Sequence, residues 1–152
     1  MSTTPQQAFT IVDMMMENDR FSQWLGIQVV EVLPGFCHLQ MMVSEDMCNG
    51  FAIGHGGIAF SLADSCCSFS ANAHGRKSVS VETAINQFKA VSPGETLTCI
   101  SNEESLGKKL AVYSAVITNH DGARIALFKG TYYRSEKRWI EPEDAAGNAH
   151  PS

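Results

Sequence analysis

Hydrophobic and polar positions along the chain first predict two short helices. Apolar residues recur at helical spacing through residues 5–18, and Thr4 followed three residues later by Gln7 forms the capping-box pattern of a helix start. Pro5 occupies the first helical position, where its missing N–H costs nothing. Residues 19–25 predict a second short turn that ends at Gly26. We expect both helices to act as packing elements.

Short alternating stretches bounded by turn residues predict six β-strands. The predicted strands are residues 27–33, 36–44, 78–90, 95–105, 109–118 and 123–134. Pro34-Gly35 separates the first two strands, and residues 91–94 and 119–122 form later turns. Consecutive strands with short connections imply antiparallel pairing. We expect the polar chain from Ser135 onward to be loosely held.

The segment GIAFSLADSCCSFSANA, residues 57–73, predicts one long buried helix. Ile58, Leu62, Cys66 and Phe69 recur three or four residues apart, and such a helix is about 25 Å long. The order of elements predicts an α+β fold in which an antiparallel β-sheet packs around this helix. We expect a single domain over residues 1–135 and a polar C-terminal tail over residues 136–152.

Composition excludes several classes of protein. The 152 residues are 44% hydrophobic and 18% charged, with a net charge of −5, which is typical of a globular domain without a basic surface for nucleic acid. The first twenty residues lack a signal-peptide pattern, and no apolar run approaches the roughly 18 residues of a membrane span. We therefore expect a cytoplasmic protein with no nucleic-acid or membrane partner.

Cysteine and histidine spacing predicts no metal site. The five cysteines are odd in number and lack the CxxC spacing, so we interpret them as small buried residues in a reducing compartment. The five histidines form neither an HxxxH nor an HxxE pair.

The loop before the long helix is rich in glycine, in the sequence NGFAIGHGG of residues 49–57. The first N–H groups of a helix lack intrahelical partners and lie at the positive end of its dipole. Such a helix start can bind a phosphate or stabilise an oxyanion. No GK[ST] follows these glycines, which argues against a nucleotide-binding P-loop and favours an oxyanion site.

Asp64 is the one charged residue in the long apolar segment. Burying a carboxylate is costly unless the group is paired or used, and no Lys or Arg lies within two helical turns. Asp64 therefore either acts as a general base or nucleophile, with a pKa raised by burial, or faces water or a hydroxyl such as that of Ser68. Gly56 precedes Asp64 by eight residues, about 12 Å along a helix. If both groups act on one carbonyl, Asp64 must come from a second copy of the chain, which predicts a homodimer.

The run NGFAIGHGGIAFSLAD resembles the signature of the hot-dog-fold acyl-CoA thioesterases of the phenylacetate-degradation type. In that signature an Asn is followed by His-Gly-Gly and then by an acidic residue in the helix, as at Asn49, residues 55–57 and Asp64. The resemblance extends over residues 21–134 and includes the strand-turn-strand SVETAINQFKAVSPGETL. It implies the hot-dog fold and thioester hydrolysis at the subunit interfaces of a homotetramer.

The resemblance also implies roles for single residues. Gly56 N–H would polarise the thioester carbonyl, Asp64 of the partner subunit would attack it or activate water, and Asn49 would hold the water or the carbonyl. His55 would orient the loop, unless it is only a helix cap, and Ser68 would assist Asp64. The substrate-binding candidates are Gly57, Ser80, Thr83, Arg76, Lys77 and Lys108. The basic residues among them could instead be solvated surface charges.

The family further implies a small, aromatic acyl-CoA substrate of the phenylacetyl or hydroxyphenylacetyl type, with coenzyme A as part of the substrate and no other cofactor. One alternative is a hot-dog hydratase or dehydratase, which needs a His soon after the Asp, whereas His74 follows Asp64 by ten residues. A second alternative is a non-catalytic acyl-CoA-binding module. The N-terminal residues are too few and too acidic for the DNA-binding segment that such sensors carry.

Overall fold

The first helix begins at the predicted capping box. In the computed structural model, which describes residues 2–142, α1 spans Pro5–Asn18. The Gln7 N–H donates to Thr4 Oγ1 at 3.2 Å, and the Thr4 N–H donates to Gln7 Oε1 at 3.0 Å. The second helix, α2 (Arg20–Trp24), starts where the side chain of Asp19 accepts the N–H of Ser22. Both predicted helices are therefore confirmed.

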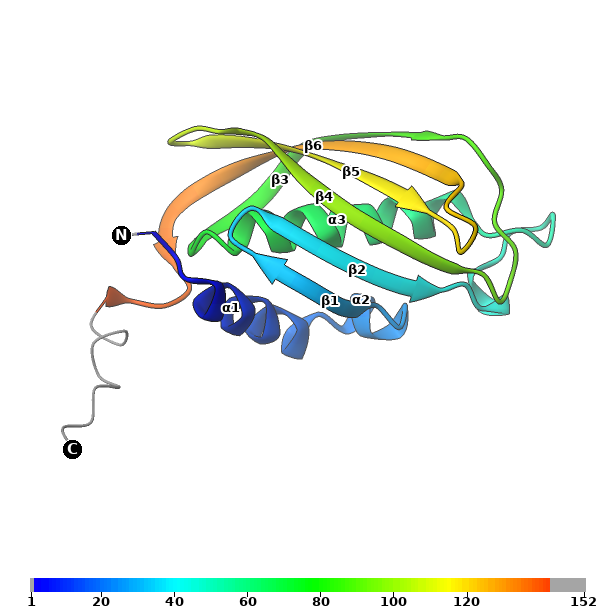
Figure 1. Cartoon of the computed structure of the whole chain (residues 1–152), viewed down its shortest axis with the longest axis horizontal. Helices are drawn as coiled ribbons and strands as arrows, with labels where there is room; N and C mark the ends of the chain where they lie inside the picture. Colours follow the sequence, from blue (N-terminus) through cyan, green and yellow to red (C-terminus); the bar gives the residue numbers. More distant parts are fainter. Residues whose placement is uncertain (1, 143–152) are drawn as a thin grey trace.

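Six strands form one antiparallel sheet, as the sequence predicts (Figure 1). They are β1 (Gln28–Leu33), β2 (Phe36–Met42), β3 (Arg76–Gln87), β4 (Thr96–Leu106), β5 (Leu110–Thr118) and β6 (Arg124–Arg138). Their order across the sheet is β1-β2-β4-β5-β6-β3, so β1 and β3 form its two edges. The turn glycines Gly35, Gly94 and Gly122 all have positive φ, the backbone conformation that the tight predicted turns require.

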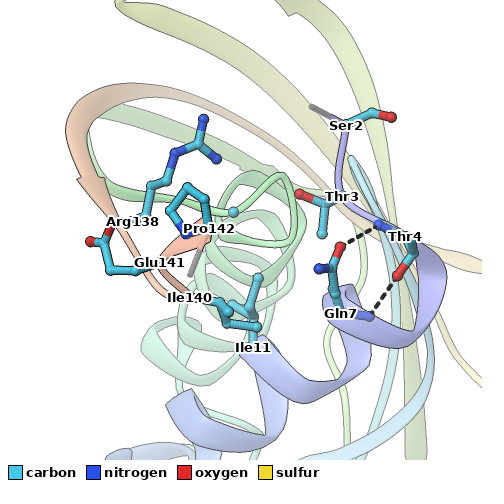
Figure 2. A pocket seen from close by; sticks show the side chains of 10 residues that line it. Ser2, Thr3, Thr4, Gln7, Ile11, Arg138, Ile140, Glu141 and Pro142 are labelled. Carbon is cyan, nitrogen blue, oxygen red and sulfur yellow. Dashed lines mark hydrogen bonds between the residues drawn. The ribbon is translucent and has the colours of Figure 1, made fainter. Parts of the chain in front are cut away.

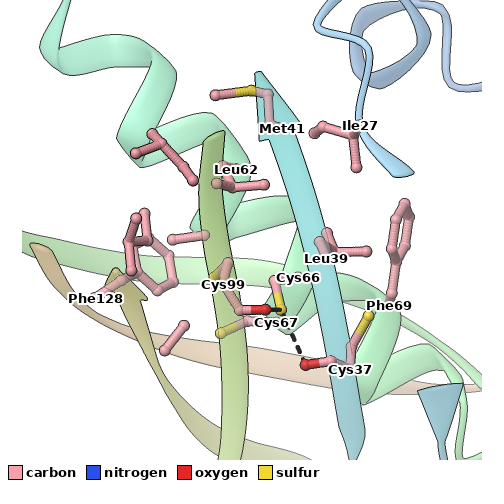
Figure 3. Close-up of a cluster of buried hydrophobic side chains, with 14 of the residues drawn as sticks. Ile27, Cys37, Leu39, Met41, Leu62, Cys66, Cys67, Phe69, Cys99 and Phe128 are labelled. Carbon is pink, nitrogen blue, oxygen red and sulfur yellow. Dashed lines mark hydrogen bonds between the residues drawn. The ribbon is translucent and has the colours of Figure 1, made fainter. Parts of the chain in front are cut away.

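The long helix α3 (Gly56–Asn72) lies against the sheet, which curves around it (Figure 1). Its residues Leu62, Cys66 and Phe69 are fully buried and pack against side chains of β2, β4 and β6 (Figure 3). The thiol of Cys66 donates to the carbonyl of Cys37 on β2 at 3.3 Å. Four of the five cysteines are buried and all five are free, in agreement with the expectation of small core residues. None of the helices within residues 2–142 is both long and apolar enough to cross a bilayer.

The last strand extends beyond the expected start of the tail at Ser135. β6 continues to Arg138, which pairs with Arg76 of β3, and the Arg76 guanidinium donates to the carbonyls of Arg134 and Ser135. Trp139 then donates its indole N–H to Asn72 Oδ1 at 2.8 Å. The expectation of a loosely held chain from Ser135 is thus wrong for these first residues. The remainder of the predicted tail over 136–152, from residue 143 onward, lies outside the described residues.

Ser101 on β4 provides a buried polar link between two strands and α3. Its Oγ accepts the N–H of Cys37 at 2.8 Å and lies 2.5 Å from the Oγ of Ser70 on α3. Cys37, Ser70 and Ser101 are all buried, so water does not readily replace these hydrogen bonds. The start of β2 therefore depends on one side-chain hydroxyl.

Replacing this hydroxyl should destabilise the fold. Ser101→Ala leaves the Cys37 N–H buried without its acceptor, so the free energy of unfolding should fall by about 1–3 kcal/mol in urea denaturation. The control is Ser105→Ala at an exposed position on the same strand, which should change it by less than about 0.5 kcal/mol. Equal losses in the two variants would contradict the assignment.

Candidate active site

The loop before α3 is held in place by backbone hydrogen bonds. Cys48 and Gly54 form a β-bridge, the Gly54 N–H donates to the carbonyl of Val91 at 2.7 Å, and the His55 N–H donates to that of Met47 at 2.8 Å. A Cβ atom on Gly54 would lie 2.5 Å from Val91 Cγ2, so this approach requires glycine. The loop lies at the end of the molecule opposite the chain terminus marked N in Figure 1. The start of α3 is therefore fixed relative to the sheet.

The first N–H groups of α3 have different partners. His55 is the N-cap residue: its Nδ1 accepts the Gly57 N–H at 2.9 Å, and its carbonyl accepts the Ile58 N–H at 3.0 Å. The Gly56 N–H has no hydrogen-bond partner among the described residues and lies at the positive end of the helix dipole. Of the two adjacent glycines, Gly56 thus offers the N–H for an oxyanion, while the Gly57 N–H is committed to the cap.

His55 accordingly has the capping role that the sequence left open beside catalysis. Because its Nδ1 accepts a hydrogen bond, the neutral ring carries its proton on Nε2. The side chain is exposed, and it orients the helix start by holding Gly57.

Asn49 stabilises the loop through its side chain. Its Oδ1 accepts the Phe51 N–H at 2.9 Å, and its own N–H donates to the carbonyl of Ile53 at 2.8 Å. Within the described part of the chain its Nδ2 makes no hydrogen bond. The amide nitrogen of Asn49 is therefore the group with which this residue could contact a ligand.

Asp64 is half-buried in the middle of α3. Burial raises the pKa of its carboxyl, a hydrogen bond from the Tyr132 hydroxyl acts to lower that pKa, and the nearby charge of Asp19 raises it further. The Tyr132 hydroxyl lies 3.1 Å from Asp64 Oδ1, and no other described side chain hydrogen-bonds the carboxylate. The alternative in which Ser68 satisfies Asp64 is therefore not observed. A desolvated carboxylate without a cationic partner is suited to act as a base or nucleophile.

One face of α3 is only partly covered by the rest of the chain, although the Tyr132 hydroxyl of the sheet reaches Asp64 on it and the Phe60 ring packs against that of Phe128. We call this face the open stripe; it consists of the half-exposed residues Gly56, Gly57, Phe60, Ser61, Asp64, Ser65 and Ser68. All of them except Phe60 are small or polar. Ser68, the predicted assistant of Asp64, thus lies on the same face one helical turn further on.

A β-bulge in the edge strand β3 orients two other predicted residues. Ser80 pairs with Tyr132 and Thr83 pairs with Gly130, because the register shifts between Ser80 and Glu82. Directly paired residues of antiparallel strands point to the same side of a sheet, and Tyr132 points to α3. The extra residue at the bulge therefore places both Ser80 and Thr83 on the side of the sheet that faces α3.

The predicted phosphate-binding cations differ in their surroundings. The Arg76 guanidinium donates to the backbone carbonyls of Lys108, Arg134 and Ser135, an arrangement that ties strands together. The Lys77 ammonium lies 4.9 Å from the centroid of the Trp139 ring, and Lys108 is exposed in the turn between β4 and β5. The two lysines are therefore better placed than Arg76 to meet a phosphate.

Two of the cavities in the described part of the chain lie at opposite ends of α3. A cavity of about 280 Å³ adjoins the helix start and is lined by Phe21, Trp24, Leu25, Asp46, Met47, Cys48, His55, Gly57, Ile58 and Ser61. The rings of Phe21 and Trp24 are stacked with centroids 6.2 Å apart. A larger cavity of about 480 Å³ lies between the start of α1 and the last described residues, and none of the predicted site residues lines it (Figure 2). The first cavity is thus the one beside the candidate oxyanion site.

Comparison with known proteins identifies the family. The thioesterase superfamily pattern matches residues 51–126. The acyl-coenzyme A thioesterase PaaI of Escherichia coli is 34% identical over 120 residues, which are 79% of this chain and 86% of that protein.

Solved structures agree with the sequence comparison. The E. coli PaaI protein from the phenylacetic acid degradation operon superposes with a TM-score of 0.87 at 31% identity, covering 90% of this chain and 99% of that one. The TT0310 protein of Thermus thermophilus superposes with a TM-score of 0.75 at 28% identity, covering 78% and 99%. With its sheet curved around α3 and its glycine-rich helix start, the chain belongs to the thioesterase superfamily and is an enzyme of the hot-dog fold.

Proposed function

We propose that the protein hydrolyses acyl-CoA thioesters of small aromatic acids to the free acid and coenzyme A. The observation that carries this proposal is the pairing of chemical groups on α3: a partly desolvated carboxylate at Asp64 and an unpartnered N–H at Gly56. The name of the E. coli relative, an acyl-coenzyme A thioesterase, supports coenzyme A as the thiol.

In the proposed reaction, Gly56 N–H and the helix dipole stabilise the negative charge that develops on the thioester oxygen. The Asp64 carboxylate either removes a proton from the attacking water or attacks the carbonyl carbon itself to give an anhydride that water then hydrolyses. In both routes the carbon–sulfur bond breaks and the thiolate of coenzyme A leaves and takes up a proton. Asn49, Ser68, Ser80 and Thr83 supply hydrogen-bonding groups for the water.

The two groups must come from different subunits. Gly56 and Asp64 of one chain are separated by about 12 Å along the helix axis, which an aspartate side chain does not span. A two-fold axis beside Phe60, midway between them, would bring Gly56 of one subunit to the partner's Asp64. We therefore propose a homodimer with two composite sites, in which the small residues of the open stripe let the two helices approach each other.

The edge strand β3 supports this mode of assembly. It is 12 residues long, contains no proline, and exposes Val79 and Val81. A long edge with exposed apolar residues is a surface that proteins usually cover or pair. The other edge, β1, packs beside α1 (Figure 1). Pairing of β3 with its copy would join the two sheets, and we further propose that two such dimers form the homotetramer.

The cavity beside the helix start supports an aromatic acyl group. Phe21 and Trp24 are both more than half exposed along it, and Leu25, Met47 and Ile58 complete an apolar lining. Aromatic rings favour stacked or edge-on contacts with one another. A phenylacetyl or hydroxyphenylacetyl group would therefore bind here, in keeping with a role in phenylacetate breakdown.

Other parts of the proposal concern the rest of the substrate and the compartment. Lys77 and Lys108 are the proposed contacts for the phosphates of coenzyme A. Five free thiols fit a reducing compartment, so we propose a cytoplasmic enzyme. The hydratase alternative would need a histidine beside Asp64, whereas His74 lies beyond the end of α3 and bonds to Glu103 at 2.5 Å.

Asp64→Asn tests the chemistry. The amide is neither a base nor a nucleophile, so kcat for phenylacetyl-CoA should fall by at least about 100-fold while the Kd of the thioester, measured by calorimetry, changes less than about twofold. Asp13→Asn, at an exposed position on α1, is the control and should behave like the wild type. Near-normal turnover by Asp64→Asn would show that the carboxylate has another purpose.

A double substitution tests the dimer. Val79→Lys with Val81→Lys places like charges on the edge strand that would face its own copy, which disfavours pairing. Sedimentation should show a monomer, and the specific activity should fall with the dimer fraction. Val30→Lys on the opposite edge is the control, since Val30 is also exposed. A fully active monomer would refute the composite site.

Trp24→Ala tests the acyl pocket. Loss of the indole should reduce kcat/KM for phenylacetyl-CoA roughly tenfold, because an aromatic contact and its buried area are lost, and should leave acetyl-CoA hydrolysis nearly unchanged. Phe9→Ala removes an aromatic residue of similar exposure on α1 that does not line the cavity, and it should alter neither rate. Equal losses for both esters would place the acyl group elsewhere.

A further inference from the structure

Tyr132 connects the buried sheet to the candidate catalytic carboxylate. It lies on β6 and is fully buried, and its hydroxyl oxygen is 3.1 Å from Asp64 Oδ1 and 3.5 Å from the Asp64 carbonyl oxygen. The ring packs edge-on against that of Tyr113, with centroids 5.8 Å apart. Neighbouring strands and this aromatic contact therefore fix the position of the hydroxyl.

We propose that Tyr132 is the positioning residue of the catalytic carboxylate: its hydroxyl holds Asp64 Oδ1, so that Oδ2 is directed to the partner's thioester. This inference rests on the proposed function, in which Asp64 performs the reaction. The carboxylate has no other hydrogen-bond donor among residues 2–142, so its orientation about the Cβ–Cγ bond depends on this one contact. The pairing of Ser80 with Tyr132 places a second hydroxyl on the same side of the sheet.

A phenol suits this purpose better than a cation. Burial raises the pKa of Tyr132 far above its ordinary value, so the group remains a hydrogen-bond donor throughout the working pH range. A lysine or arginine here would neutralise the carboxylate and remove much of its basicity. The phenol orients Asp64 and still leaves it a full negative charge.

The charges around Asp64 determine the direction of a pH test. The titratable groups that act on it or respond to it are Tyr132, Asp19 at the start of α2, and Cys67 on α3 itself. Burial and Asp19 raise the pKa of Asp64, and only the Tyr132 hydrogen bond lowers it. Without that hydrogen bond the carboxyl should hold its proton to a higher pH.

A purely structural explanation is that a buried hydroxyl needs an acceptor and Asp64 happens to provide one. The two explanations predict different measurements. A structural hydroxyl changes the free energy of unfolding alone, whereas a positioning hydroxyl also changes the pH dependence of kcat/KM and the value of kcat.

The experiment compares Tyr132→Phe with the wild type. The acid limb of the kcat/KM profile should shift to higher pH by about one unit, because a smaller fraction of the Asp64 carboxyl is ionised at a given pH. On the plateau kcat should fall roughly tenfold through loss of orientation, with KM changed less than about twofold. Tyr113→Phe is the matched control: it removes a buried hydroxyl that donates to Glu103 instead, and its acid limb should not move.

A second variant covers the case in which Tyr132→Phe does not fold. Incorporation of 3-fluorotyrosine at position 132 keeps the shape and makes the phenol a stronger donor, so the acid limb should move to lower pH. An unmoved limb in the folded variants, with Asp64→Asn inactive, would overturn the inference and leave the proposed function intact. An active Asp64→Asn would instead overturn the proposed function.

Discussion

A carboxylate placed in the middle of an apolar helix loses part of its hydration, and the surrounding residues must compensate for that loss or make use of it. At Asp64 the compensation is small. One phenol donates to the carboxylate, no described cation bonds to it, and Asp19 adds a repulsive charge. The arrangement keeps a partly desolvated carboxylate at a fixed position, which is the property that a general base or a nucleophile requires.

The shape of the fold explains where this carboxylate can act. The sheet covers α3 fully on the side of Leu62, Cys66 and Phe69, and it leaves the open stripe partly exposed. Asp64 and the Gly56 N–H both lie on that stripe, although too far apart to meet in one chain. The uncovered edge β3 borders the same region through Ser80 and Thr83. A second copy of the chain would pair with the edge strand, cover the open stripe and bring a Gly56 N–H to Asp64.

Local sequence patterns predicted the fold well because their causes are local. The capping box of Thr4 and Gln7 and the three-to-four spacing of α3 each depend on residues a few positions apart. The contact between Asp64 and Tyr132 joins residues 68 positions apart and depends on the register of β6, which no local pattern encodes. The paired orientation of Ser80 and Thr83 likewise depends on a bulge that the sequence does not mark.

The structural role of Arg76 was also beyond sequence reasoning, since the three carbonyls that bind it belong to Lys108 in the turn between β4 and β5 and to Arg134 and Ser135 of β6. At the helix start the signal was stronger. Spacing and resemblance together were enough to select the glycines, His55 and Asp64. Only the hydrogen bonds of the cap show that the Gly57 N–H is bound by His55 while the Gly56 N–H has no partner among the described residues. The residues of the candidate site can thus be identified from sequence where they lie in a contiguous motif, whereas their hydrogen-bond partners can be identified only from the structure.

The raised pKa of Asp64 has a consequence for stability. The folded chain binds a proton at this carboxyl more tightly than the unfolded chain does, so the stabilising contribution is present at low pH and is lost as pH rises through the folded pKa. At neutral pH the ionised Asp64 therefore lowers the free energy of unfolding. Tyr132 limits this loss, because its hydrogen bond favours the ionised form. The same phenol that orients the carboxylate also makes its charge tolerable inside the fold, which joins the stability of the helix to the chemistry that we propose for it.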